Sequence, residues 1–183
     1  PAQVARDAER MRAEEEAALS ETRRRLAFWK TMPADDAGWQ AEHLDERDWV
    51  SVSVPMLWEQ AGWTGLDGVA WYRTSFELSD AQAKHGIRLS MGRVDDSDQT
   101  WVNGVAVGGM REQWNTPRRY EVPAAVLHAG RNVLAVRVED GGGGGGIHGA
   151  PDELCLTTVD LSCLPLPHAW RFRVADAKFS SID

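Results

Sequence analysis

The sequence has little of what marks nucleic-acid-binding and membrane proteins. Its 183 residues include 28 acidic and 20 basic side chains, for a formal net charge of -8. Phosphate binding depends on clustered Lys and Arg, and no basic face stands out, so we expect no nucleic-acid partner. No apolar run is long enough to span a bilayer, and no charged start with an apolar middle marks a signal peptide. We therefore expect no membrane partner.

Cysteine is scarce, with only Cys155 and Cys163 present. Both lie in or next to residues 154–161, whose pattern predicts a strand. In an extended chain their Cα atoms would be about 26 Å apart, far beyond disulfide reach, so a bridge requires a turn between them. We expect two free, mostly buried thiols, which leaves the redox compartment open.

Metal-binding, phosphate-binding and catalytic patterns are missing as well. The glycine run 141–146 lacks both the Gly-Lys-Ser/Thr of a phosphate loop and the βαβ setting of a dinucleotide site. It predicts either a flexible loop or close passage of the backbone by a ligand or neighbouring domain. We expect no cofactor, no metal and no catalytic residue in this chain. No metal-ligand spacing links the five histidines, at positions 43, 85, 128, 148 and 168.

What is present indicates one domain with an appended helix, since 43% of the residues are apolar. Residues 1–33 carry apolar side chains at helical intervals and predict a helix that Pro33 ends. We favour a packing or connecting helix over a coiled-coil or membrane-surface helix, because acidic and basic runs offset each other. Residues 34–48 predict a polar linker. The chain starts with Pro rather than Met, which indicates a piece of a longer protein.

From residue 49 onward the apolar period changes to two, which is typical of strands with one buried face. Asn103-Gly104 predicts a tight hairpin, because both residues tolerate the positive φ of a type I′ turn. Residues 123–127 predict a single helical turn. The fold class is all-β, an antiparallel sandwich with an N-terminal helix. The predicted strands are 49–54, 69–78, 87–91, 99–102, 105–107, 119–122, 133–139, 154–161 and 170–174.

Asp95, Asp96 and Asp98 form the densest carboxylate cluster. In an extended segment Asp96 and Asp98 would share one face and Asp95 would lie on the other. Three interpretations stay open: acceptors for sugar hydroxyls or an interdomain contact, carboxylates that satisfy local N–H groups, and ligands of a calcium ion. We favour the first and place calcium last, because few other oxygen ligands are nearby.

Tryptophan is abundant, with nine residues against two Tyr and four Phe. A Trp ring can stack on the apolar face of a sugar, but buried Trp also anchors a sandwich core, and we assign most of them to the core. Trp58, Trp63 and Trp114 lie in turn-like contexts and stay candidates for stacking. Asn115 and Arg118 could offer an amide and a guanidinium to a sugar or to the carboxylate of a sialic acid. The alternative for Arg118 is a surface counter-charge.

The chain resembles a known family in four segments, namely Asp67-Gly68-Val69-Ala70-Trp71-Tyr72-Arg73, Asp95-Asp96-Ser97-Asp98, Trp114-Asn115-Thr116-Pro117-Arg118 and Gly146-Ile147-His148-Gly149. They are similar to the galactose-binding-like jelly roll of glycoside hydrolase family 2, and more closely to the version inserted into bacterial sialate O-acetylesterases. The resemblance implies a jelly roll over 49–174 and a tail, 175–183, that returns toward a missing catalytic domain. His148 stands where the family has Trp.

The resemblance also implies a role for Asn103 beyond its turn, since the matching Asn of family 2 β-galactosidases reaches the substrate sugar. Among the histidines, only His148, beside the glycine run, is placed near a site. The esterases' Gly-Gln-Ser-Asn block and later Asp-x-x-His are absent from this sequence. The candidate sugar-binding residues are Asp95, Asp96, Asp98, Asn103, Trp114, Asn115, Arg118 and His148.

The predicted function is an accessory carbohydrate-recognition domain of a sialate O-acetylesterase-like enzyme. Its expected partners are a glycan or acetylated sugar and the catalytic esterase domain of the same parent chain. Two alternatives stay open: a structural module that binds no sugar, and the sugar-binding domain of a family 2 glycosidase, whose catalytic carboxylates would lie on another domain. The resemblance alone implies a periplasmic or extracellular location.

Overall fold

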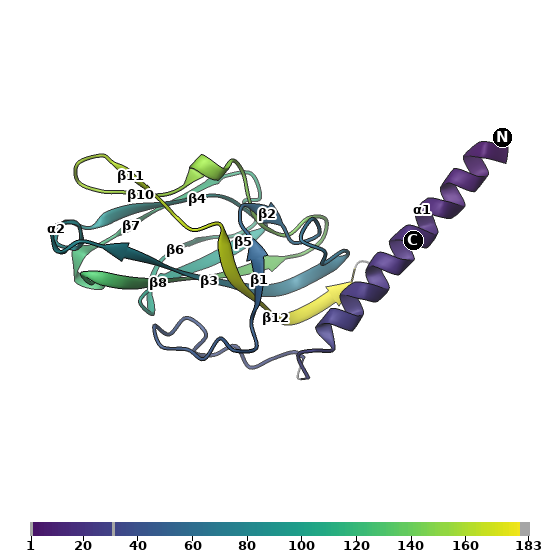
Figure 1. Cartoon of the computed structure of the whole chain (residues 1–183), viewed down its shortest axis with the longest axis horizontal. Coiled ribbons are helices and arrows are strands. Elements are labelled where there is room, and N and C mark those ends of the chain that lie inside the picture. The colour runs from purple at the N-terminus through teal and green to yellow at the C-terminus, as the bar shows by residue number, and fades with distance from the viewer. Residues whose placement is uncertain (1, 31, 180–183) are drawn as a thin grey trace.

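The computed structural model describes residues 2–30 and 32–179. It is a sandwich of two antiparallel sheets, with a helix projecting from one end (Figure 1). The predicted all-β sandwich with an N-terminal helix is confirmed. Of the predicted tail 175–183, residues 175–179 belong to the last strand, and residues 180–183 lie outside the described part of the chain.

The first sheet has six strands in the order β1-β12-β3-β8-β5-β6, and every neighbouring pair is antiparallel. β3 and β8 are paired from Gly68 and Asp140 at one end of the sandwich to Leu78 and Gly130 at the other. The strands are β1 (Val50–Ser53), β3 (Leu66–Leu78), β5 (Ser97–Val102), β6 (Val105–Met110), β8 (Gly130–Asp140) and β12 (Ala169–Phe179).

The second sheet also has six strands, and β4 pairs with three of the others. The first residues of β4 lie between β7 and β10, whereas its last residues pair with β9. The sheet continues from β10 to β11 on one side and from β9 to β2 on the other. The strands are β2 (Met56–Leu57), β4 (Ile87–Asp95), β7 (Pro117–Val122), β9 (Gly146–His148), β10 (Leu154–Thr157) and β11 (Cys163–Pro165).

The core lies between the two sheets and explains the period of two in the sequence. β7 alternates between exposed and buried residues along its whole length, and Leu89 and Val94 of β4 are fully buried. Phe172 of β12 lies among aromatic rings, with its centroid 5.0 Å from that of Tyr72 and 5.3 Å from that of Trp63. Burial of each such side chain stabilises the fold by about 1.5–3 kcal/mol.

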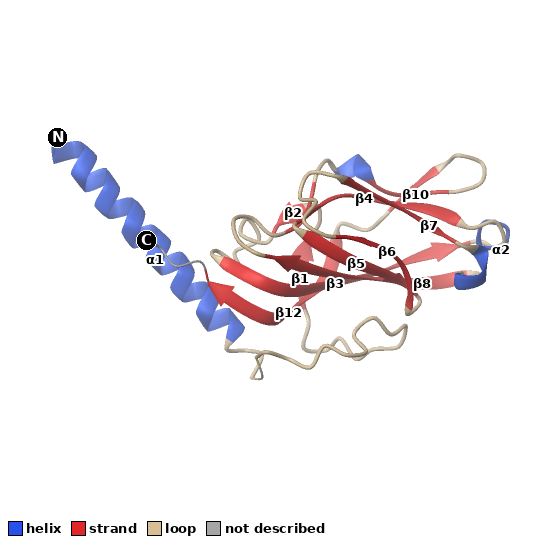
Figure 2. Cartoon of the chain, turned by 180° about the vertical axis from the view of Figure 1, so that it is seen from behind, coloured by secondary structure: helices blue, strands red, loops and turns tan. Residues whose placement is uncertain are grey.

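The helix α1 (Ala2–Leu26) projects away from the sandwich, and only its C-terminal part packs on it (Figure 2). Leu26 is buried, and Trp29, just past the helix, stacks on Trp63 with ring centroids 5.4 Å apart. The predicted packing or connecting helix is present, but it ends at Leu26 rather than at Pro33. Within the described residues, no helix combines the length and the apolar character needed to cross a membrane.

Residues 34–48 connect α1 to β1, as expected of a linker, but they lie against the outer face of the first sheet. Trp39 is buried there and packs edge-on against Trp71, with ring centroids 6.1 Å apart. The Trp71 indole donates to Asp36 at 2.8 Å, and the buried Arg73 donates to the carbonyl of Trp39 at 2.6 Å. The segment is therefore a packed strap, which covers Trp side chains on the face of the sheet that the core does not use.

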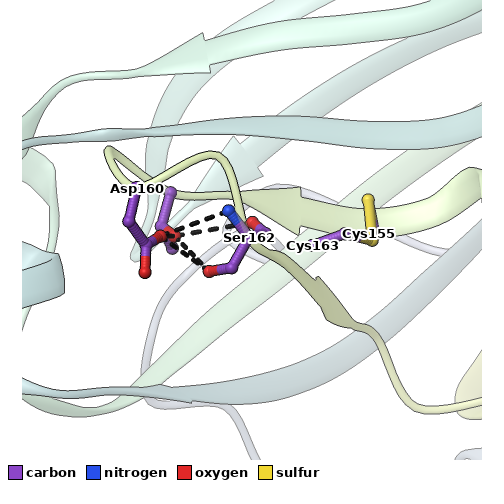
Figure 3. Close-up of a disulfide and its surroundings, with 5 residues drawn as sticks. Cys155, Asp160, Ser162 and Cys163 are labelled. Carbon is purple, nitrogen blue, oxygen red and sulfur yellow. Dashed lines mark hydrogen bonds between the residues drawn. A yellow bond between two sulfur atoms is a disulfide. The ribbon is translucent and has the colours of Figure 1, made fainter.

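Cys155 and Cys163 form a disulfide between β10 and β11 (Figure 3), so the expectation of two free thiols is wrong. The strand predicted over 154–161 ends at Thr157, and a turn follows. Asp160 stabilises this turn, because its Oδ1 accepts hydrogen bonds from the backbone N of Ser162 at 3.2 Å and from its hydroxyl at 2.7 Å. The reversal places the two Cα atoms 5.6 Å apart, within the range of a disulfide.

The remaining elements are short. The helical turn predicted within 123–127 is confirmed as η1 (Ala124–Val126). The single-turn helix α2 (Asp80–Ala83) starts with a capping box, in which the Ser79 hydroxyl accepts from the backbone of Gln82. The helix η2 (Pro151–Glu153) precedes β10. Strands β2, β9 and β11 are too short to show a period, and the sequence did not predict them.

Candidate functional site

Several predicted site residues meet at the end of the sandwich where β4 ends and β5 begins, the end opposite α2 (Figure 1). Asp95, the last residue of β4, pairs with Gly146 of β9. The backbone of Asp96 accepts a hydrogen bond from Gln113 N at 3.0 Å, which ties the loop before β7 to this turn. Segments far apart in the sequence thus form one surface.

An acidic cluster of Asp95, Asp96 and Asp140 lies at this end. One carboxylate oxygen of each residue lies within 4.8 Å of the others, and Asp140 is buried while the other two are half-buried. The backbone N–H of Gly141 donates to Asp96 Oδ2 at 3.1 Å, and that of Gly142 donates to Asp140 Oδ1 at 3.2 Å. The glycine run therefore starts by hydrogen bonding to two members of the cluster.

Burial disfavours ionisation of Asp95 and Asp140. It raises the pKa of Asp95 to about 7, and the neighbouring carboxyl of Asp96 acts in the same direction. Burial also raises the pKa of Asp140 to about 6, against the effect of the hydrogen bond from Gly142. Three carboxyls in a half-buried space repel one another when ionised. The cluster is thus an electrostatically unfavourable arrangement, which a ligand carrying positive charge or hydrogen-bond donors would relieve.

Asp98 does not join this cluster but forms an ion pair with Arg118. Both side chains are 0% exposed, and Nε of Arg118 lies 2.6 Å from Oδ1 of Asp98. The hydroxyl of Tyr120 donates to the same carboxylate at 2.9 Å. The expectation that Asp98 shares a face with Asp96, opposite Asp95, is wrong, because the chain turns between β4 and β5. The surface counter-charge considered for Arg118 is wrong too, since this guanidinium is internal.

Arg118 organises the loop before β7. Its Nη1 donates to the carbonyls of Gln113 and Thr116, and its Nη2 donates to those of Val94 and Asp96 at 2.9 and 3.1 Å. Every nitrogen of the guanidinium is therefore engaged by the protein. A direct sugar contact by Arg118 or Asp98 stays a prediction, and in the structure both side chains hold the loop in place from inside.

The loop carries the exposed aromatic ring of the site. Trp114 is 57% exposed, and its carbonyl lies 3.1 Å from Nε2 of His148. Arg93 of β4 donates to the carbonyl of Asn115 at 3.2 Å and pairs with Glu153. The structure thus brings Trp114, Asn115 and His148 together, with the indole ring of Trp114 exposed. Their contact with a sugar stays a prediction.

The end of the glycine run packs on the core. A Cβ at Gly145 would lie 2.0 Å from the indole of Trp58, so only glycine fits there. Glu59 accepts a hydrogen bond from Gly145 N at 3.2 Å, and burial raises the pKa of this carboxyl to about 7. Trp58 and Trp63 are both buried, which leaves Trp114 of the three stacking candidates considered from sequence.

Asn103 lies at the other end of β5, about 20 Å away by the rise of a strand. The predicted type I′ turn is confirmed, with φ of 50° at Asn103 and 79° at Gly104. Its amide nitrogen donates to the carbonyl of Val126 at 2.8 Å and to Asn132 at 2.9 Å, and its amide oxygen accepts from Val133 N at 2.8 Å. The side chain of Asn103 thus links the β5–β6 turn to η1 and to β8. If Asn103 contacts a sugar, as the sequence resemblance implies, that contact lies far from the acidic cluster.

A hollow of about 670 Å³ lies beside the loop that carries Trp114, over β5, β6 and β8. Polar side chains line it, among them Gln99, Arg111, Arg137 and Glu139. Amides and charged groups of both signs are suited to hydrogen bonding with sugar hydroxyls. The hollow therefore offers room for sugar units next to the loop that bears Trp114.

Sequence reasoning missed Asp140, Glu59 and Arg93. Asp140 directly precedes the glycine run, and that position was the one available signal for it. Glu59 and Arg93 have no local pattern that marks them, because their roles come from pairing of β4 with β9 and from the fold of the loop after β2.

Comparisons with known proteins agree with this architecture. Residues 45–144, more than half of the chain, match the family described as beta-galactosidase second all-beta domain. A glycosyl hydrolase family 2 member from Bacteroides cellulosilyticus DSM 14838 is 24% identical, with a TM-score of 0.53, over 62% of this chain and 18% of that one. No curated protein matches the chain.

Two β-glucuronidase structures are similar in the same way. One from glycoside hydrolase family 2 is 20% identical with a TM-score of 0.52, over 60% of this chain and 13% of that one. The Bacteroides uniformis enzyme is 18% identical with a TM-score of 0.51, over 74% and 16%. Such identities establish the fold alone, and the chain spans less than a fifth of the length of each of these proteins.

These findings support the family 2 side of the sequence resemblance, and none of them points to an esterase. The match covers the strap from residue 45, both sheets through β8, and the start of the glycine run. The chain is an all-β sandwich of the glycoside hydrolase family 2 type, and it belongs to the family of the beta-galactosidase second all-beta domain.

Proposed function

We propose that this chain is an accessory sugar-recognition domain of a family 2 type glycoside hydrolase and that the loop bearing Trp114 is its contact surface. The family match supports the accessory role, and the exposure of Trp114 carries the choice of surface. An indole ring on a loop held from below by Arg118 is preorganised, so little conformational entropy is lost on binding. The partner is the catalytic domain of the same parent chain.

The electrostatics favour a neutral sugar. Asp95, Asp96, Asp140 and Glu59 lie at this end of the sandwich, and the chain as a whole carries a net charge of -8. A uronic or sialic acid would bring another carboxylate toward this surface, whereas the hydroxyls of a galactoside or xylo-oligosaccharide can donate to acidic acceptors. Neutral sugars should therefore bind more tightly than glucuronic or sialic acid.

Tryptophan fluorescence can test this proposal on the whole chain. Galactosides or xylo-oligosaccharides should bind in the millimolar range, about -4 kcal/mol. Trp114→Ala should weaken that binding at least about tenfold, which is about 1.4 kcal/mol. Phe28→Ala is the matched control, because Phe28 is an equally exposed aromatic residue, 62% exposed, just past α1. Unchanged spectra with neutral and acidic sugars alike would contradict the proposal and favour a structural module.

A second candidate is the corresponding domain of a sialate O-acetylesterase. The segments Asp95–Asp98 and Trp114–Arg118 support it, because they carry the closer sequence resemblance. The reading frame of the parent protein distinguishes the two candidates. A Gly-Gln-Ser-Asn block upstream would favour the esterase, whereas a barrel domain with two catalytic carboxylates would favour the glycoside hydrolase.

We also propose a periplasmic or extracellular location. The disulfide between Cys155 and Cys163 supports it, because disulfides persist in oxidising compartments. Mass spectrometry of the protein isolated from its source under thiol-blocking conditions tests this. Two blocked thiols would contradict the location.

A further inference from the structure

The acidic cluster has an observation beside its charge that points to a ligand. Asp140 is only 2% exposed, and its Oδ2 is buried and accepts no hydrogen bond from any described residue. The other oxygen of the same carboxylate already accepts from Gly142 N. A buried carboxylate oxygen without a donor is costly unless something else neutralises it.

The described part of the chain gives the cluster no ion-paired cation. Among residues 2–30 and 32–179, no Lys, Arg or His forms an ion pair with Asp95, Asp96 or Asp140. The charge of Arg118 acts on Asp95, but its guanidinium is ion-paired with Asp98 and donates to four backbone carbonyls. The cluster therefore combines three carboxylates and a buried oxygen without a donor, and none of the three is ion-paired with a described side chain.

We propose that Asp95, Asp96 and Asp140 bind a calcium ion, which fixes the β4–β5 turn against the start of the glycine run. Calcium binds oxygen ligands at about 2.3–2.6 Å, so two ligands on opposite sides of the ion lie about 5 Å apart. The mutual separations of at most 4.8 Å among the three oxygens fit ligands of one ion. Backbone carbonyls and water complete the coordination, since calcium takes six to eight oxygens.

This inference stands apart from the proposed sugar recognition. The ion would act on the structure of the turn and of residues 141–142, whereas the sugar surface is the exposed ring of Trp114. From the sequence, calcium came last for Asp95, Asp96 and Asp98, because few other oxygen ligands are nearby. In the structure Asp98 is paired with Arg118 instead, and β8 brings Asp140 to the turn from 44 positions downstream of Asp96.

Calorimetric titration with calcium chloride, together with thermal unfolding, tests the site on the whole chain. One calcium should bind per chain with a dissociation constant of about 10⁻⁵–10⁻³ M and should raise the unfolding temperature. Asp140→Asn and Asp95→Asn should each weaken binding at least about tenfold. Because each removes a charge from a repulsive cluster, the cation-free variants should be at least as stable as the wild type.

Asp152→Asn is the matched control, since Asp152 is an exposed carboxylate in η2, and this variant should keep the wild-type response. Absence of binding at about 10 mM calcium, ten times the weakest constant expected, would overturn the proposal. An equal response in the wild type and in Asp140→Asn would overturn it as well, because the ion would then bind elsewhere. Tighter binding of magnesium than of calcium would overturn the choice of ion. None of these outcomes bears on sugar binding, which has its own titration.

Discussion

Replacement of Arg118 by Met tests whether the buried ion pair is structural. The change removes the partner of Asp98 and leaves a carboxylate that is 0% exposed with only the hydroxyls of Tyr120 and Thr100 as donors. It also removes one donor from each of four backbone carbonyls, of which those of Asp96 and Gln113 keep a backbone N–H donor. Loss of one partner of a buried pair costs about 3–5 kcal/mol, a large share of the about 5–15 kcal/mol that stabilises a typical domain.

Urea unfolding followed by Trp fluorescence measures this free energy by linear extrapolation. Arg119→Met is the control, because Arg119 is the adjacent residue and its side chain is exposed; it should change the free energy of unfolding by less than about 0.5 kcal/mol. A loss below about 1 kcal/mol for Arg118→Met, or one equal to that of Arg119→Met, would refute the structural role. Lost sugar affinity in a fully stable Arg118→Met variant would instead support the direct sugar contact predicted from sequence.

Three further predictions follow from individual contacts. Asn103→Gly keeps the turn, and the turn alone predicts a change within about 1 kcal/mol. The variant also loses three hydrogen bonds, one of them to the buried Asn132, so in urea unfolding the free energy of unfolding should fall by about 3 kcal/mol. A fall below about 1 kcal/mol would mean that Asn103 acts only as a turn residue. Burial raises the pKa of Glu59 to about 7, so the fold favours the neutral carboxyl. The stability that the neutral form contributes is present below the unfolded pKa and is lost as the pH rises through about 7. Between about pH 4 and pH 8, Glu59→Gln should therefore gain unfolding temperature relative to the wild type, and the absence of that trend would contradict burial of the carboxyl. Reduction of the Cys155–Cys163 disulfide removes the loop closure that constrains the unfolded chain. It should therefore lower the free energy of unfolding by about 2.5 kcal/mol, as measured by unfolding with and without reductant. An unchanged midpoint of unfolding would argue against the bridge.

Local patterns in the sequence predicted the elements whose cause is local. The period of two identified most of the longer strands, and Asn103-Gly104 identified the hairpin, because its φ values depend on those two residues. The length of α1 was overestimated, because Trp29 leaves the helix to stack on Trp63, a contact between distant segments.

Features made by distant segments could not be predicted in this way. The acidic cluster needs the end of β8 beside the β4–β5 turn, and no sequence spacing encodes that Asp140 meets Asp95. The disulfide depends on a turn at Asp160 inside a segment whose composition favours a strand. The packing of residues 34–48 on the sheet could not be predicted either, because their composition is polar apart from a few residues such as Trp39, which is buried there.

The most direct test of the proposed sugar surface is a nuclear magnetic resonance titration that follows the indole N–H signals of the nine Trp residues. The indole N–H groups of Trp29, Trp58 and Trp71 donate to acceptors inside the protein, and those rings are buried. A neutral galactoside or xylo-oligosaccharide should therefore shift the indole signal of Trp114 and the backbone amide of Asn115, and sialic or glucuronic acid should shift them less. Saturating sugar that leaves the Trp114 signal in place would contradict sugar recognition by this loop.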